Sequence, residues 1–150
     1  MAIEQLSVFV ENKKGTILDV TKSIAEAGVD IRALSVADTQ DFGILRLIVS
    51  DIEKAKDALS EGNCVVSVTK VIAVSVSDVP GGLSKVLELL AEADINVEYV
   101  YAFITVSGQH AYVVLRVEDN DKASEVLASK GISLVTEEDI KLLKKSKISY

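Results

Sequence analysis

The chain of 150 residues has very little of several residue types on which particular structures depend. It contains one cysteine, one proline, one histidine and no tryptophan, and only 5% of its residues are aromatic. A single cysteine, Cys64, cannot form an intramolecular disulfide framework and suits a reducing compartment. Because 49% of the residues are hydrophobic and only one is proline, a compact chain is expected, not a disordered one. Its core must be built mainly from Val, Ile, Leu and Ala.

Residues for nucleophilic or metal chemistry are equally scarce. His110 is the only histidine, so the sequence offers neither a Ser-His-Asp triad nor a His-rich zinc motif. It stands at the start of a predicted strand, where the first half of the chain has Phe42, and this favours a structural role. Cys64 is interpreted as a small buried apolar residue. We therefore predict no catalytic residue, no metal ligand and no cofactor, which leaves an enzyme as a distant alternative.

The chain also lacks an excess of positive charge. Its formal net charge is −7, with 8 basic and 11 acidic residues in 1–70 and 8 and 12 in 71–150. Proteins that bind nucleic acid depend on Lys and Arg for affinity, so no nucleic-acid partner is expected. The longest apolar runs are a few residues, too short to span a membrane, and the N-terminus has no signal-peptide pattern. The expectation is a cytoplasmic protein with no membrane partner.

What the chain does contain is an internal repeat. A shift of 66 residues places Leu6–Ile31 on Ile72–Val97 without a gap, so that Gly15 meets Gly81. A two-residue insertion then changes the shift to 68 for the rest of the copy. Chance similarity between Val-rich segments is the alternative, but it does not explain why both the glycine and the helix phase are kept.

Each copy has the same expected order of elements: strand, helix, strand, strand, helix, strand. Alternating apolar residues predict the strands, and apolar stripes on one face predict the helices. In the first copy the three later strands are expected at Asp30–Ala37, Phe42–Val49 and Val65–Val68. In the second copy they are expected at Ile95–Val106, His110–Val117 and Ile132–Val135.

Two helix starts are predicted from capping residues. Ser50 with Glu53 has the spacing of a capping box and predicts the second helix of the first copy. Thr136 with Asp139 could cap a short last helix, Glu137–Lys145. A solvated tail helix or a frayed end is at least as good an interpretation of that segment as a functional one.

The order of elements is that of the ferredoxin-like split βαβ fold, an α+β class with a four-stranded antiparallel sheet and two helices on one face. We expect one βαββαβ unit in residues 1–69, a second in 70–136, and a C-terminal helix or tail in 137–150. Only Thr69-Lys70 separates the two units, so the two sheets are expected side by side without a flexible linker.

The loop from the first strand into the first helix is the candidate binding site in each copy. The second copy has Ser77-Asp78-Val79-Pro80-Gly81-Gly82-Leu83 there, and the first has Glu11-Asn12-Lys13-Lys14-Gly15-Thr16-Ile17. A helix N-terminus offers unpaired N–H groups to an anion. Pro80 fixes the start of the turn, and the two glycines allow a close backbone approach or positive φ. An ordinary tight turn that caps a helix explains these residues equally well.

The second copy resembles a known family. Its pattern Asp78-x-Pro80-Gly81-x-Leu83-x-x-Val86, followed by Leu90-Ala91-Glu92 and Ile95-Asn96-Val97, is similar to the signature of ACT domains, small βαββαβ modules that bind amino acids and regulate enzymes. The first copy keeps Gly15 and the helix phase but has Lys14 where the family usually has proline. Together the two copies cover about residues 2–135.

The resemblance implies where a ligand would bind. In ACT domains the effector lies at the junction of paired units, between the glycine loop of one and the second-strand region of its neighbour. Transferred by position, this implicates in the first copy Asn12, Gly15, Thr16 and Asp30, and in the second Asp78, Val79, Pro80, Gly81, Gly82, Leu83 and Asn96. Loop amides would bind the ligand carboxylate, and Asp78 could take its ammonium group. Lys13 and Lys14 make the first copy the poorer candidate.

We therefore hypothesise a regulatory protein that binds an amino acid, forms a homodimer through sheet edges or faces, and acts on a regulated enzyme in trans. The alternative is a structural module of the same fold that binds another protein and no small ligand. Replacement of Asp78 or Gly81 distinguishes the two, because it should abolish function only in the first case.

Overall fold

The structure is a computed structural model that describes residues 1–104 and 110–143. Its elements follow one another along the chain as β1 (Ile3–Glu11), α1 (Thr16–Glu26), β2 (Ile31–Asp38), β3 (Phe42–Val49), α2 (Ile52–Glu61), β4 (Val65–Ser77), α3 (Gly82–Glu92), β5 (Val97–Ala102), β6 (His110–Val117), α4 (Asn120–Ser129), β7 (Leu134–Val135) and α5 (Glu137–Leu142).

The chain folds as two compact units. Glu4–Thr69 forms the N-terminal unit, and the chain from Lys70 onward, together with Met1–Ile3, forms the C-terminal unit. The strand order is β2-β3-β1-β4 in the first and β7-β4-β6-β5 in the second. The pairs β1–β3 and β2–β3 are antiparallel, as are β4–β6, β4–β7 and β5–β6. The predicted α+β ferredoxin-like fold is thereby confirmed.

The repeat is visible in the backbone itself. Six residues in the described part of the chain have positive φ, and they form three pairs: Gly15 with Gly81, Gly28 with Asp94, and Asn63 with Gly131. The first two pairs are separated by 66 residues and the third by 68, the two shifts found in the sequence. A left-handed backbone position is costly for most residues other than glycine, asparagine and aspartate, so its recurrence at these positions indicates that both copies trace the same path.

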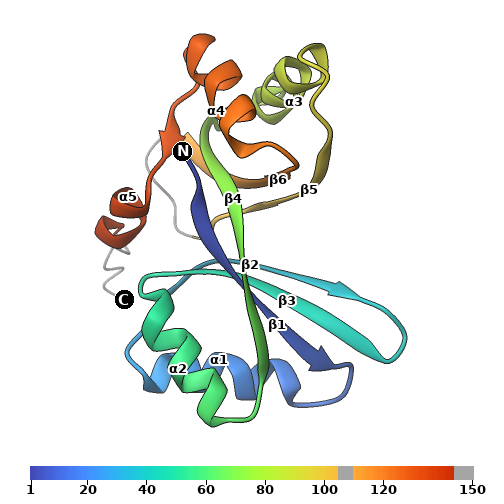
Figure 1. Ribbon diagram of the computed structural model, residues 1–150, viewed down its shortest axis with the longest axis vertical. Helices are drawn as coiled ribbons and strands as arrows, with labels where there is room; N and C mark the ends of the chain where they lie inside the picture. The colour runs from blue at the N-terminus through green and yellow to red at the C-terminus, as the bar shows by residue number, and fades with distance from the viewer. Residues whose placement is uncertain (105–109, 144–150) are drawn as a thin grey trace. The chain divides into compact units, whose positions relative to one another are not determined.

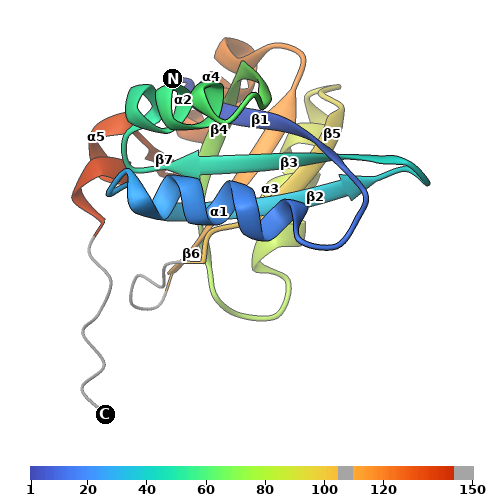
Figure 2. The same ribbon diagram turned by 90° about the horizontal axis from the view of Figure 1, so that it is seen from below.

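Each unit has its own apolar core between its sheet and its two helices. In the N-terminal unit, Leu6 and Val8 of β1 pack with Leu45 and Leu47 of β3 against the buried face of α1 and α2. The C-terminal unit repeats this core with Ile72, Val74, Val86, Leu90, Leu115 and Leu127. Figure 1 shows α1 and α2 together on one face of the N-terminal sheet, and in Figure 2 helix α1 runs along β2 and β3.

The capping box predicted at Ser50 is wrong. The N-cap of α2 is Asp51, whose side chain accepts a hydrogen bond from the Lys54 N–H. Ser50 is used elsewhere, because its hydroxyl accepts a hydrogen bond from the Asp30 N–H at 2.9 Å. Asp119 caps α4 through the Lys122 N–H in the same way, 68 residues later.

The capping box at the last helix is confirmed, because the Thr136 side chain accepts from the Asp139 N–H and the Asp139 side chain accepts from the Thr136 N–H. The helix is shorter than predicted and ends at Leu142, while the last residues of the predicted span lie outside the described part.

Strand bounds also differ from those predicted. The fourth strand of the first copy and the first strand of the second are one continuous strand, β4. The strand predicted at Ile95–Val106 is shorter and begins only at Val97, because the Ile95 N–H donates to the Leu90 carbonyl and closes the end of α3. Val106 lies outside the described residues.

Candidate functional site: the glycine loops

The loops that precede α1 and α3 have the same geometry. Gly15 has φ 88° and Gly81 has φ 85°, and each is the N-cap of its helix. Neither cap supplies a side-chain hydrogen bond. The first N–H groups of a helix have no partner within the helix. Here the Gly82 N–H donates to the Val79 carbonyl at 3.0 Å and the Thr16 N–H to the Lys13 carbonyl at 3.4 Å, so the uncapped donors of both loops begin at the second helical residue. The predicted positive φ at Gly81 is confirmed.

Gly82 requires glycine for a different reason. A Cβ atom added there would lie 2.0 Å from the Ser77 carbonyl oxygen, far inside van der Waals contact. The predicted close backbone approach is thus confirmed at Gly82. The equivalent residue of the first copy is Thr16, whose hydroxyl donates to the Glu11 carbonyl at 2.8 Å and to the Lys13 carbonyl at 2.9 Å. The C-terminal loop is therefore wound more tightly than the N-terminal loop.

The polar residue at the mouth of each loop has a different environment in the two units. The Asn12 side-chain amide donates to the carbonyls of Thr39 and Gln40 at 3.4 and 3.5 Å, in the turn between β2 and β3. Asp78 is exposed, and within residues 1–104 and 110–143 its carboxylate has no ion pair with a lysine or arginine. Asn12 thus has a structural role, whereas the charge of Asp78 is available to a ligand.

The N-terminal loop also contains an internal ion pair. The Lys13 ammonium lies 2.9 Å from a carboxylate oxygen of Glu11. The hydrogen bond and the positive charge of Lys13 lower the pKa of the Glu11 carboxyl below its usual value, and the same contact raises the pKa of Lys13. Both side chains are well exposed, so the pair contributes little to stability. It does neutralise one of the two lysines of this loop.

Asp30 and Asn96 do not join the glycine loop of their own unit. Asp30 immediately precedes β2, and the first residue of β2, Ile31, pairs with Val49 at the end of β3. The glycine loop instead follows Glu11, which pairs with Phe42 at the start of β3. Those two ends of β3 are seven residues apart, which corresponds to roughly 23 Å. Val97 and Ser77 are likewise paired with opposite ends of β6, Val117 and His110.

The surroundings of Asp30 and Asn96 also differ from each other. Asp30 forms an ion pair with the nearly buried Arg32 at 2.6 Å. Asn96 is exposed and lines an open pocket of about 890 Å³ together with Asp94, Asp119 and Asn120. In each unit, most candidate residues thus lie together in the glycine loop, whereas Asp30 or Asn96 lies apart from them at the other end of the sheet.

Two further features of the described residues bear on function. Among the described residues, no group of three or more His, Cys, Asp or Glu side chains is placed to hold a metal ion. Within the same residues, no helix combines the length and the apolar character needed to cross a membrane.

The family described as ACT domain pair matches residues 1–144. The chain belongs to this family. The ACT domain pair is similar in structure to protein BT0572 from Bacteroides thetaiotaomicron, with 40% sequence identity and a TM-score of 0.88 over 95% of this chain and 98% of that one. Among curated proteins, no sequence matches the chain.

Two more distant structures share the fold of this ACT domain pair. The ligand-free regulatory subunit of aspartate kinase from Thermus thermophilus has 17% identity and a TM-score of 0.63, with 84% of this chain and 91% of that one covered. The aspartokinase alpha and beta subunits give 18% identity and a TM-score of 0.56, with 85% and 95% covered.

Sequence reasoning missed one set of residues in this ACT domain pair. Lys85, His110 and Lys130 line a pocket beside the C-terminal glycine loop. They are far apart along the chain and form no motif, so no local pattern indicates them.

Proposed function

We propose that this ACT domain pair is a regulatory protein that binds an amino acid at the glycine loop of its C-terminal unit. The observation that carries the proposal is the β4–α3 loop, where left-handed Gly81 leads into a helix without a side-chain cap beside the exposed carboxylate of Asp78. A ligand carboxylate can accept hydrogen bonds from N–H groups at a helix N-terminus. Its ammonium group can pair with Asp78. The loop thus offers partners for both charged ends of an amino acid.

The N-terminal loop is a poorer binding site in this proposal. It has the same left-handed glycine, Gly15, but its side chains Asn12 and Lys13 already have partners. Asn12 donates to the β2–β3 turn, and Lys13 is paired with Glu11. A ligand would have to replace these contacts, so we expect it to bind the C-terminal unit more strongly.

The relatives support a regulatory role in which the regulated enzyme is a separate protein. The Thermus thermophilus relative is a regulatory subunit of aspartate kinase, and we infer by analogy that this chain acts in trans on an enzyme in the cytoplasm. Fold similarity alone does not identify that enzyme.

We further propose that the chain forms a homodimer through a sheet edge. Leu34 and Val36 lie on the edge strand β2 and are 37% and 41% exposed. Val100 occupies the position equivalent to Leu34 on the edge strand β5 and is 39% exposed. Unpaired edge strands with apolar side chains favour association with another chain. Light scattering after size exclusion should therefore give twice the monomer mass, and Val36→Lys should give a monomer.

Calorimetric titration of the protein with each of the twenty amino acids tests the proposed function. We expect one amino acid, or a few of similar shape, to bind at micromolar to sub-millimolar strength and to raise the melting temperature. If none of the twenty amino acids binds, the proposal is overturned, and a structural module that binds only another protein is favoured.

A further inference from the structure

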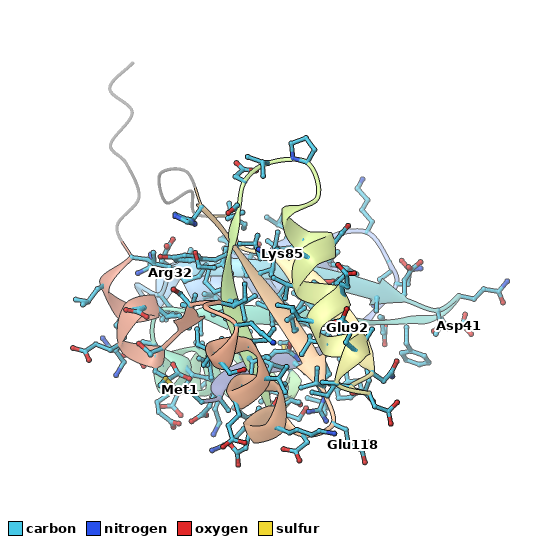
Figure 3. All side chains as sticks on the ribbon, turned by 90° about the horizontal axis from the view of Figure 1, so that it is seen from above. Met1, Arg32, Asp41, Lys85, Glu92 and Glu118 are labelled. Atoms are coloured by element: carbon cyan, nitrogen blue, oxygen red, sulfur yellow. The ribbon has the colours of Figure 1, made fainter. Side chains whose placement is uncertain are left out.

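A small pocket of the C-terminal unit has only basic and neutral side chains, although the whole chain has a net charge of −7. Its volume is about 220 Å³, and it lies where β4, the first turns of α3, the start of β6 and the turn between α4 and β7 meet. The titratable residues that line it are Lys85, His110 and Lys130. Figure 3 shows Lys85 on α3 beside β4.

The positive charge of this pocket is not neutralised by neighbouring side chains. Within the described ranges 1–104 and 110–143, no carboxylate lies within 4.0 Å of the ammonium group of Lys85 or Lys130. His110 is exposed, and an imidazole ring has at least one N–H in both its neutral and its charged form. An anion in the pocket would therefore meet donors that have no competing acidic partner.

Neutral groups around the pocket add further donors. Three serine residues line it: Ser75, Ser77 and Ser133. Helix α3, whose first turn also lines it, has neither a side-chain cap nor an acidic residue in that turn. The helices α2, α4 and α5 have both. Since the N-terminal end of a helix carries a partial positive charge, this end adds to the attraction for an anion.

The N-terminal unit serves as an internal comparison, because it has the same fold without these side chains. The repeat places Asp19 at the position of Lys85, Phe42 at that of His110 and Gly62 at that of Lys130. The three serines are replaced as well, by Phe9, Glu11 and Val65. The fold therefore requires none of the basic residues.

We propose that this pocket binds phosphate, either as the free ion or as the phosphoryl group of a small metabolite. A phosphate group carries a charge of about −1.5 to −2 near pH 7 and has several strong acceptor oxygens, which matches two lysines and a histidine better than a single carboxylate does. Pockets for whole small molecules usually exceed about 300 Å³, so this one suits a single phosphoryl group whose carrier remains outside. It shares Gly82 and the N-terminus of α3 with the proposed amino-acid site, but its lysines and histidine lie outside that site, so it does not depend on that proposal.

Titration with inorganic phosphate at constant ionic strength, followed by amide NMR shifts, tests the pocket. We expect saturable shifts at Ser77, Gly82 and Gly131. The double variant K85Q/K130Q should bind at least about tenfold more weakly, because it removes two charged hydrogen-bond donors. The matched control K22Q/K54Q removes the same charge from exposed positions of the other unit, and its affinity should equal that of the wild type.

The outcomes separate the proposal from non-specific attraction and from misfolding. Shifts that do not saturate, or an equal loss of affinity in K22Q/K54Q, would overturn it. If the amide spectrum shows that K85Q/K130Q is misfolded, the single variant His110→Gln decides, because it leaves both lysines in place and should still weaken binding. Glycerol phosphate in place of inorganic phosphate identifies the source: tighter binding indicates a phosphorylated metabolite, and equal binding indicates phosphate itself.

Discussion

Replacement of Gly82 by alanine should destabilise the C-terminal unit more than any other glycine-to-alanine change in the two loops. The added Cβ would lie 2.0 Å from the Ser77 carbonyl oxygen, whereas ordinary contact begins at about 3.4 Å. The neighbouring group is backbone, so it cannot rotate away as a side chain does. Overpacking of this kind costs about 1–3 kcal/mol, and we expect a loss of about 2 kcal/mol in the free energy of unfolding.

Urea denaturation followed by circular dichroism measures this loss as a lower midpoint with an unchanged m-value. Gly62→Ala is the matched control, because Gly62 has a negative φ and a Cβ there would be 3.6 Å from its nearest neighbour, the Leu59 carbonyl oxygen. Its stability should stay within about 0.5 kcal/mol of the wild type. A Gly82→Ala protein as stable as this control would refute the tight loop and, with it, the contrast between the two units.

Three further changes test particular contacts. In Gly81→Ala the added Cβ has no atom within 4 Å, but the residue must keep φ near 85°. Denaturation should therefore show a loss of about 1–2 kcal/mol in the free energy of unfolding, caused by the left-handed backbone alone. No loss would mean that the loop has another conformation. Asp119→Ala removes the cap of α4 and should cost about 1 kcal/mol in the same assay, whereas Asp121→Ala on the same turn should cost less. Lys13→Gln should return the lowered pKa of Glu11 to its ordinary range, as measured by carboxyl NMR titration. Because that pKa is lowered in the folded state, the stabilisation by Glu11 is present above its unfolded pKa and is lost as the pH falls through its folded pKa; a titration curve unchanged by Lys13→Gln would contradict the ion pair.

The repeat and the order of elements could be predicted from sequence, because both depend on local patterns. The alternation of Val8 and Val10 and the apolar stripe of Val20 and Ile24 each lie within one element. The cap of α2 was harder to predict, since Ser50 and Asp51 both suit an N-cap. The choice depends on a partner 20 residues away, the Asp30 N–H, which occupies the Ser50 hydroxyl.

The site could be predicted only in part. The two adjacent glycines before a predicted helix indicated a positive φ or a close backbone approach. Gly81 has the positive φ, and Gly82 has the close approach. The separation of Asn96 from the loop of its own unit follows from the predicted order of elements, because α3 returns the chain to the opposite end of the sheet before β5 begins. The basic pocket depends on Lys85, Lys130 and His110, which come from three parts of the chain that only folding brings together.

The most direct test of amino-acid binding at the C-terminal loop compares two variants of equivalent residues. Asp78→Ala removes the carboxylate proposed to bind the ligand ammonium, and Asn12→Ala changes the corresponding residue of the other loop. Calorimetric titration with the amino acid that binds the wild type should show about 10- to 100-fold weaker binding to Asp78→Ala, from the loss of about 1.5–3 kcal/mol. The affinity of Asn12→Ala should be unchanged. Equal losses in the two variants, or a loss only in Asn12→Ala, would contradict the assignment of the site to the C-terminal unit.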